Sequence, residues 1–493
     1  LEQPGTTSQS HMLDFSVDVA HWPAAALQQR VAITTGSYDH AVDGVALTLN
    51  RLAAHLLRQG HEVLVLSPGR GSWLRQHRPV LRHAGRLVRI PSVPLPIWSE
   101  YRLTFGLGRR ARAALADFEP TVVHVAVQDA LGHAAVRWAE TNGVPVLCSH
   151  HTRWNAYLSY YPLARGLRAP LEAFMWWGMR RFHGRCAATY PPSESVADEL
   201  RLHGVPRVGV WPRGVDRQLF RPEARSEAWR ERVLGSAASD ASPGLWQRVF
   251  SLGVPPNQTA LVLFVARLRW EKGLSGLIAV LDELQRRRLP HLAVVVGEGP
   301  ARGELQRRLP QARFLGKLTG DALATAYASS DVFLYPSESE GWGATCLEAQ
   351  ASGVPVVAYR ASGIVEVVVH GAGGLLAPAG DVPAITAATA SLLTDATRRR
   401  AMGRAAARHA ARFDWAVSGD LMLGRYSAHA APVPPRSHGG GDAARPPPPM
   451  IEQLHAWWHS RNATVSALGT AAARAAVARV AAARAVEAVE AMG

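Results

Sequence analysis

The chain has 493 residues, a formal net charge of +15 and a sequence pI near 10.5. A single hydrophobic core stops growing near ~250–300 residues, so this length predicts two domains. A composition of 47 % hydrophobic and 19 % charged residues excludes a wholly disordered or collagen-like chain. No apolar run approaches the ~18 residues that a spanning helix needs. We therefore expect a soluble or peripheral membrane protein, cytoplasmic or organellar, without a transmembrane helix.

The basic charge is carried almost entirely by arginine, since Lys272 and Lys317 are the only lysines. Two interpretations stay open: a general compositional drift toward arginine, and a functional basic face. No nucleic-acid-binding motif is visible, so nucleic acid is not an expected partner. The three scattered cysteines favour a reducing compartment. The chain begins with Leu1, so we expect a fragment or a processed product.

From Arg30 onward, apolar strands alternate with periodic helical stretches. In chain order, the first series is the strand Val31–Thr34, the helix Val45–Arg58, the strand Glu62–Leu66, the strand Val122–Val125, the helix Ala130–Glu140 and the strand Pro145–Cys148. The second series is Leu261–Val265, the helix Leu274–Arg287, the strand Leu292–Val296, the helix Arg302–Leu309, the strands Arg313–Leu315, Asp331–Leu334 and Val354–Ala358, and the helix Asp395–Arg412. Such alternation predicts two doubly wound α/β domains with parallel sheets.

Changes in composition suggest where the domains end. Residues 213–258 include the Ser-, Ala-, Gly- and Pro-rich stretch Arg221–Gln258, which we expect to connect the domains and to hold an insertion. The segment Ala431–Met450 reads as a Pro/Gly linker, and Gly469–Gly493 as an Ala-rich tail of low order. The predicted organisation is an extension over 1–28, a first domain over 29–212, the connection over 213–258, a second domain over 259–405, a helical region over 406–430 and the linker and tail over 431–493.

One stretch of the second series carries two carboxylates in a strand, glycine turn and helix context. It reads Tyr335-Pro-Ser-Glu-Ser-Glu-Gly-Trp-Gly-Ala-Thr-Cys-Leu-Glu, with Glu340 just before the glycine turn and Glu348 inside the helix that follows it. Ligands of open parallel sheets bind beyond the carboxyl ends of strands, where helix N-termini attract anions. Gly341 and Gly343 would let the backbone approach a phosphate or sugar, and Glu348 would accept hydrogen bonds from a diol. Solvated glutamates on a capped helix are the alternative.

This Glu-x7-Glu pattern resembles the retaining glycosyltransferases of family 4, which have the two-domain GT-B fold. Further matches, in the same order and from about Arg30 to Trp415, are Ser149-His-His-Thr, Pro212-Arg-Gly-Val-Asp, Phe264-Val-Ala-Arg-Leu-Arg-Trp-Glu-Lys-Gly and Val296-Gly-Glu-Gly-Pro. Within the family, the chain looks closest to sulfolipid (sulfoquinovosyl) synthases and to lipid or glycan α-mannosyltransferases. These motifs do not separate the two groups.

The resemblance assigns roles to individual residues. Arg267 and Lys272 match the family's diphosphate-binding pair, and permanent cations suit phosphate oxygens. Gly341, Trp342, Gly343 and Glu348 would complete the donor site, with Glu340 near the sugar. Gly44 matches the glycine of the first loop that contacts the donor phosphates. His151 matches the histidine beside the transferred sugar, although His150 is adjacent and successive strand side chains point opposite ways.

No Asp-x-Asp motif or cluster of His, Asp and Glu suited to a metal stands out, so we expect no metal and no other cofactor. A predicted helix over Leu171–Arg185, starting after Pro170, would have an apolar face of Leu171, Phe174, Met175, Gly178 and Phe182. Its tryptophans and arginines suit peripheral docking on an anionic membrane. An ordinary helix packed on the sheet is the alternative.

The sequence thus predicts a retaining transferase that moves a hexose-type sugar from a UDP- or GDP-sugar to a lipid or glycan acceptor. A non-catalytic nucleotide-sugar or polyanion-binding protein and a glycoside hydrolase are the alternatives. A hydrolase needs two carboxylates roughly 5–9.5 Å apart, whereas two glutamates eight positions apart on one helix would be separated by about 12 Å. Donor base, sugar, acceptor and oligomeric state are not specified by these patterns.

Overall fold

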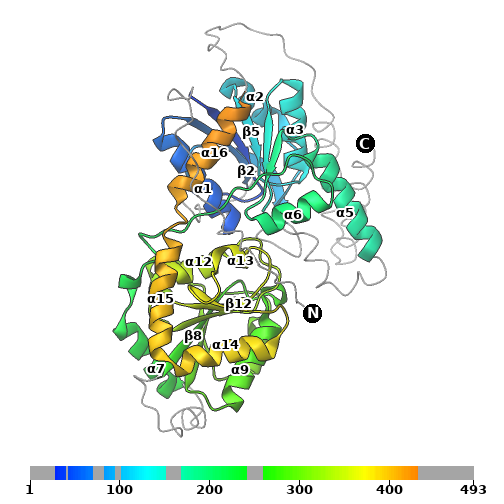
Figure 1. Cartoon of the computed structure of the whole chain (residues 1–493). Coiled ribbons are helices and arrows are strands. Elements are labelled where there is room, and N and C mark those ends of the chain that lie inside the picture. Colours follow the sequence, from blue (N-terminus) through cyan, green and yellow to red (C-terminus); the bar gives the residue numbers. More distant parts are fainter. Residues whose placement is uncertain are drawn as a thin grey trace, which may run out of the picture. The chain divides into compact units, whose positions relative to one another are not determined.

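The computed structural model in Figure 1 contains two β-sheets, which are connected and covered by helices. The structure describes residues 28–39, 43–69, 83–94, 102–151, 168–240 and 259–430. The expected linker and tail over 431–493, residues 1–27 of the expected extension and residues 241–258 of the expected connection lie outside these ranges. Both predicted series of strands and helices are confirmed, and each forms one sheet with its helices.

The first sheet has seven strands in the order β4-β3-β2-β1-β5-β6-β7. All neighbouring strands are parallel except β4, which runs antiparallel to β3. The order reverses at β1, which pairs with β2 on one side and β5 on the other, so the sheet is doubly wound. The strands are β1 (Arg30–Thr34), β2 (Glu62–Gly69), β3 (Arg86–Pro94), β4 (Arg102–Thr104), β5 (Val122–Val125), β6 (Val146–Ser149) and β7 (Ala188–Tyr190).

The second sheet has six strands, all parallel, in the order β10-β9-β8-β11-β12-β13. Here β8 is the strand at which the order reverses. The strands are β8 (Ala260–Val265), β9 (His291–Val296), β10 (Arg313–Gly316), β11 (Val332–Tyr335), β12 (Val356–Tyr359) and β13 (Gly374–Ala377). Most of them are short apolar runs buried on both faces, as parallel strands covered by helices must be.

Helices connect these strands. Around the first sheet they are α1 (Gly44–Arg58), α2 (Gly108–Phe118), α3 (Ala130–Thr141), α5 (Arg168–His183) and α6 (Glu194–Leu202). From Pro222 onward they are η3 (Pro222–Ala224), α7 (Glu227–Asp240), η5 (Trp270–Lys272), α9 (Leu274–Arg286), α10 (Arg302–Arg308), α11 (Gly320–Ala328), α12 (Ala344–Ala351), α13 (Ile364–Val367), α14 (Val382–Thr394), α15 (Ala396–Ala410) and α16 (Trp415–His429).

Alternate residues of β1 supply two separate cores. Val31 and Ile33 pack with the buried side chains of α1, whereas Ala32 belongs to the core that includes α2 and α3. Successive strand side chains point to opposite faces, so helices cover both faces of the first sheet. Helix α1 begins at an N-cap, since the Asp43 carboxylate accepts the Ala46 N–H at 2.8 Å.

The last described helix, α16, belongs to the core of the first sheet. Its Met422 and Tyr426 are fully buried there, and α16 lies beside α1 (Figure 1). The preceding helix, α15, instead contributes Met402 and Ala410 to the core of the second sheet. The predicted helical region over 406–430 is therefore divided between two cores, because the chain crosses back near Asp414, where Val215 and Asp414 form a β-bridge.

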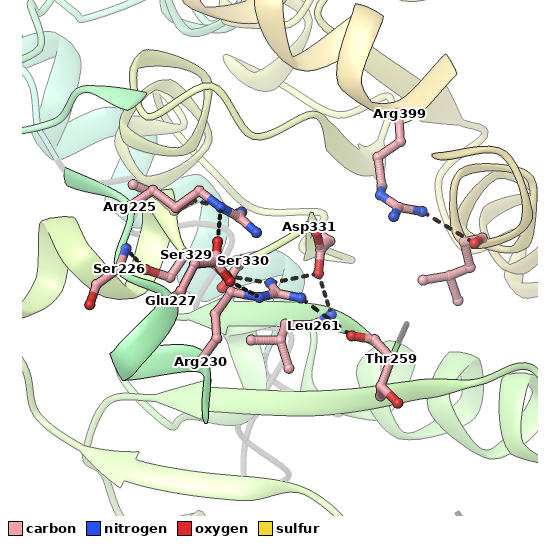
Figure 2. A network of polar contacts seen from close by, with 12 residues as sticks. Arg225, Ser226, Glu227, Arg230, Thr259, Leu261, Ser329, Ser330, Asp331 and Arg399 are labelled. Carbon is pink, nitrogen blue, oxygen red and sulfur yellow. Dashed lines mark hydrogen bonds and ion pairs between the residues drawn. The ribbon is translucent and has the colours of Figure 1, made fainter. Parts of the chain in front are cut away.

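Part of the expected interdomain connection is a helix that packs on the second sheet. Val233 and Leu234 of α7 are buried in that core. Figure 2 shows its Arg230, whose Nη1 donates to the Ser329 carbonyl at 2.6 Å and to the Asp331 carboxylate at 2.8 Å. The same Asp331 oxygen accepts the Leu261 N–H at 2.8 Å. The segment is thus part of the second domain, because Arg230 binds Asp331, the residue before β11, and Asp331 in turn binds Leu261 of β8.

We predict that Arg230→Met lowers the free energy of unfolding by about 3 kcal/mol, because it removes one partner of a largely buried ion pair. The Arg230 and Asp331 side chains are only 8 % and 13 % exposed. Urea unfolding measures the difference. The control is Arg287→Gln, at an arginine that is 43 % exposed in its pair with Glu283, where we expect a change within about 0.5 kcal/mol. Equal effects of the two substitutions would contradict the prediction.

Candidate active site

The predicted site residues follow strands that end at the same edge of each sheet. Gly44 begins α1, which follows β1, and His151 lies two residues beyond β6. Arg267 and Lys272 follow β8, and Glu340 and Gly341 follow β11. Because the sheets are parallel and doubly wound, these are the carboxyl ends where such folds bind ligands.

Lys272 and Glu340 form a largely buried ion pair, although 68 residues separate them. The Lys272 ammonium lies 3.0 Å from Glu340 Oε2 and 3.3 Å from Oε1, and both side chains are 18 % exposed. The Tyr335 hydroxyl donates to Glu340 Oε2 at 2.5 Å. Burial alone would raise the pKa of Glu340, but Lys272, Tyr335 and Arg267 together leave the pKa below its usual range. The carboxylate is therefore ionised at neutral pH.

A glycine makes this ion pair possible. Gly273 follows Lys272 at a φ of +75°, and a Cβ placed there would lie 1.9 Å from the Pro336 carbonyl oxygen. Only glycine adopts this conformation without strain and allows so close an approach. The turn after β8 therefore lies directly against the segment after β11, which brings Lys272 to Glu340.

Glu348 lies inside α12, as predicted, and is held differently from Glu340. The Tyr327 hydroxyl of α11 donates to Glu348 Oε2 at 2.9 Å. Burial raises the pKa of Glu348 to about 7, and this effect exceeds those of Tyr327 and the more distant Arg51, which act in the opposite direction. Glu340 precedes α12, so the two glutamates do not share a helix, and the expected 12 Å separation along one helix does not apply.

The glycine turn between the two glutamates is accessible in part. A Cβ at Gly341 would contact only Pro192 Cγ, at 4.0 Å, and Gly343 has a φ of +83° and caps α12. The Trp342 ring is buried in the second core against Phe413. A donor could meet Trp342 only through its backbone, so its predicted role in donor binding stays a prediction.

Gly44 is the first residue of α1, and nothing lies within 4 Å of the position that a Cβ would take. The described part of the chain thus leaves room beside Gly44, as its predicted contact with phosphates requires. Residues 40–42 of the same loop lie outside the described ranges.

His151 is held through both ring nitrogens. Its Nε2 lies 2.7 Å from Ser149 Oγ, and its Nδ1 lies 3.1 Å from an Arg213 guanidinium nitrogen. The neighbouring His150 is 5 % exposed and its ring lies edge-on to His183. Burial, and then the Arg213 charge, lower the pKa of His151 well below its usual range, so its imidazole is neutral.

The sequence analysis assigned no role to several residues that hold the site. Tyr335 and Tyr327 orient the two glutamates, and Ser149 and Arg213 hold His151. Tyr335 and Ser149 are the last residues of their strands, so attention to polar residues at strand ends would have identified them. Tyr327, on a helix, has no such signal.

Another missed contact joins α6 to the glycine turn. The Ser193 hydroxyl donates to the Gly341 carbonyl at 2.8 Å. The Glu366 carboxylate accepts the backbone N–H groups of Glu194 and Ser195, both at 2.9 Å, and so caps the start of α6. The turn that carries Gly341 is therefore held from the first domain as well as by its own helix.

The predicted apolar face of α5 is wrong in its first turns. Phe182 is buried as predicted, but Leu171 and Phe174 are 39 % and 65 % exposed, whereas Trp176 and Met179, outside the predicted face, are buried. The helix has apolar residues on most sides, and the neighbouring Val196 and Leu200 of α6 select the face with Trp176 and Met179. It also starts at Arg168, so that Pro170 lies in the first turn, where its missing N–H costs nothing.

Two known protein families match parts of this sequence. Residues 42–219 match Glycosyltransferase Family 4, and residues 252–409 match Glycosyl transferases group 1. A GDP-mannose-dependent alpha-mannosyltransferase of Mycolicibacterium smegmatis is 37 % identical over 405 residues, which are 81 % of this chain and 97 % of that protein. The chain belongs to glycosyltransferase family 4. It is a glycosyltransferase, which speaks against the hydrolase and the non-catalytic alternatives.

Other relatives and solved structures agree with this assignment. Sulfoquinovosyl transferase SQD2 of Arabidopsis thaliana is 30 % identical over 396 residues, 78 % of this chain and 71 % of that protein. The structure of a sucrose-phosphate synthase from Thermosynechococcus elongatus has a TM-score of 0.60 at 19 % identity and covers 81 % of this chain and 99 % of that one. That of Anabaena HepE with UDP and glucose has a TM-score of 0.57 at 18 % identity, over 81 % and 100 %. These two likenesses confirm the predicted GT-B fold.

Glu348 gives a prediction about stability. Its pKa of about 7 in the folded protein lies above the ordinary 4.5, so the stability that its proton provides is full below pH 4.5 and is lost as pH rises toward 7. We expect Glu348→Gln to gain stability over the wild type across this window, by about 3 kcal/mol at pH 8 and by none near pH 4.5.

Urea unfolding of both proteins from pH 4.5 to 8 measures this difference. Glu338→Gln is the control, since Glu338 is an exposed glutamate of the same segment and its difference from the wild type should stay constant. A constant difference for Glu348→Gln as well would show that Glu348 is not buried in this way.

Proposed function

We propose that the protein transfers a hexose-type sugar from a UDP- or GDP-sugar to a lipid or glycan acceptor, with retention at the anomeric carbon and without a divalent metal. The observation that carries this proposal is the cluster of Arg267, Lys272 and Glu340 at the carboxyl ends of β8 and β11. A diphosphate leaving group develops negative charge as the glycosidic bond breaks, and fixed cations stabilise that charge.

Relatives guide the choice of donor and acceptor. Several are named GDP-mannose-dependent alpha-mannosyltransferases, and one is a sulfoquinovosyl transferase. GDP-mannose is therefore the first donor to test, followed by UDP-sugars. In this proposal Gly44, Gly341, Gly343 and Glu348 bind the donor, as does the backbone of Trp342.

The first domain would supply the acceptor side of the reaction. His151 lies beyond the carboxyl end of β6, and we assign it to the surroundings of the transferred sugar. We assign Glu340, in the second domain, to the surroundings of the same sugar. Because Lys272 already pairs with Glu340, a bound diphosphate would share this ammonium with the carboxylate.

The proposal that no divalent metal is needed rests on the cations of Arg267 and Lys272. Among the residues that the structure describes, no three His, Cys, Asp or Glu side chains form a group that could hold a metal ion. Turnover measured in a chelator tests this part, because activity that disappears without a divalent cation would contradict it.

We predict that Arg267→Met and Lys272→Met each lower kcat/KM for the nucleotide sugar by about 10²-fold or more, the usual loss when one donor to a developing negative charge is removed. Transfer of radiolabelled sugar from GDP-mannose and from a panel of UDP-sugars is the measurement, and circular dichroism checks folding. Arg404→Met, at an exposed arginine of α15, should leave kcat/KM unchanged. Folded Arg267 and Lys272 variants with wild-type turnover would refute the proposed donor site.

We also propose that α5 makes peripheral contact with an anionic membrane. Phe174 and Trp177 are 65 % and 51 % exposed, and their rings stack 5.7 Å apart. The Arg181 guanidinium lies over the Trp177 ring at 5.8 Å. Aromatic rings beside arginines suit the interface of an anionic bilayer. Within the described ranges, no helix is both long and apolar enough to cross a membrane.

We predict that the double substitution Phe174→Ser with Trp177→Ser weakens binding to vesicles of phosphatidylglycerol and phosphatidylcholine by about tenfold or more, because two apolar rings no longer enter the interface. Vesicle flotation measures binding. Val417→Ser, at an exposed apolar residue of α16, is the control. The contact is excluded if the double variant floats with the vesicles as well as the wild type does.

A further inference from the structure

A chain of hydrogen bonds runs from His151 through the interior of the first domain to α16. Ser149 Oγ lies 2.7 Å from His151 Nε2 and 2.7 Å from His124 Nε2. His124 Nδ1 lies 2.5 Å from the Tyr426 hydroxyl. The four residues come from β5, β6, the segment after β6 and α16, and three of them are at most 2 % exposed. This chain joins the predicted site histidine to the last described helix.

Arg213 determines the direction of the first bond in the chain, between His151 and Ser149. It is 7 % exposed, packs over the Trp211 ring at 3.9 Å, donates to the Trp211 carbonyl at 3.1 Å and lies 3.1 Å from His151 Nδ1. Burial lowers the pKa of its guanidinium to about 9, so it keeps its charge at neutral pH. A guanidinium only donates hydrogen bonds, so His151 Nδ1 must accept.

The position of the His151 proton then follows. A neutral imidazole that accepts at Nδ1 carries its proton on Nε2, so His151 donates to Ser149 Oγ. The Ser149 hydroxyl has its own proton and a second lone pair, so it either donates to His124 Nε2 or accepts from it, and the Tyr426 hydroxyl correspondingly accepts from His124 Nδ1 or donates to it. Both rings are neutral, because burial first, and the Arg213 charge second, lower the pKa of His124 to about 3 and that of His151 well below its usual range.

We propose that Arg213, Ser149, His124 and Tyr426 are positioning residues of the transfer reaction, which fix the tautomer and the ring orientation of His151. This inference rests on the proposed function, since it assumes that His151 borders the transferred sugar. With both nitrogens engaged by the protein, His151 acts through its position and not as a proton carrier. A ring held at both ends keeps one orientation throughout turnover, which is what a preorganised site requires.

The state of His151 can be measured without turnover. Nitrogen-15 spectra of histidine-labelled full-length protein distinguish protonated from unprotonated ring nitrogens, and His151→Gln identifies the His151 signals. In the wild type we expect His151 to be a single tautomer with its proton on Nε2. In Ser149→Ala the hydrogen bond at Nε2 is lost while Arg213 still donates to Nδ1, so we expect the proton to stay on Nε2 and the Nε2 signal to shift because that nitrogen has lost its acceptor.

Kinetics of the same variants test the effect on transfer. For Ser149→Ala we expect kcat to fall about tenfold or more while the donor KM changes by less than about twofold, as when a partner that orients a site histidine is removed. Ser149→Thr keeps the hydroxyl and should restore both the Nε2 signal and most of kcat. Tyr426→Phe, which removes only the final hydroxyl of the chain, serves as a second variant if Ser149→Ala fails to fold, and it should lower kcat in the same sense.

Thr121→Val is the matched control. Thr121 has a buried hydroxyl in the same domain, which accepts the Arg30 N–H at 3.1 Å at the opposite end of the sheet. The inference is overturned if Ser149→Ala keeps the wild-type His151 signals and kcat, or if Thr121→Val lowers kcat as much. A wild-type protein without transferase activity would instead refute the proposed function, while the tautomer measurement would still decide whether the chain of bonds exists.

Discussion

The contact between Gly273 and the Pro336 carbonyl is the constraint on which the second half of the site depends. Parallel strands bring their carboxyl ends to one edge, but the loops that follow them can take many courses. Here the absence of a single Cβ lets the turn after β8 lie against the segment after β11. Lys272 and Glu340, far apart in sequence, then meet in a largely buried ion pair. The arrangement of charge at the donor site follows from this one approach of two backbones.

The two glutamates show how similar residues acquire different chemistry from their surroundings. Glu340 has an ammonium and a hydroxyl as partners and is ionised, whereas Glu348 has one hydroxyl and a raised pKa. In the first domain, Arg213 has a comparable influence on His151, since a donor that never accepts removes the choice between tautomers. Lys272, remote in sequence, keeps Glu340 ionised, and Arg213 sets the tautomer of His151, whereas burial itself decides the protonation of Glu348.

Much of this molecule could be predicted from its sequence, because it is encoded locally. The apolar run Val122–Val125 is a strand with the predicted bounds, and Glu348 lies in a helix as its context suggested. The partners of the site could not be predicted, because His124 and Tyr426 are 302 positions apart and nothing in either segment marks the other. The buried face of α5 was also misjudged, since its hydrophobic pattern allows several faces and the packing of α6 selects one.

The return of α16 to the first sheet has a consequence for how the chain is made. Proteins emerge from the ribosome in order, and a domain whose residues are contiguous can fold before the next is synthesised. The core around β1 and α1 includes Met422 and Tyr426, which are translated only after the whole second sheet. Until α16 is synthesised, part of the apolar surface of the first domain therefore stays uncovered. The core of the second domain can be completed earlier in translation than that of the first.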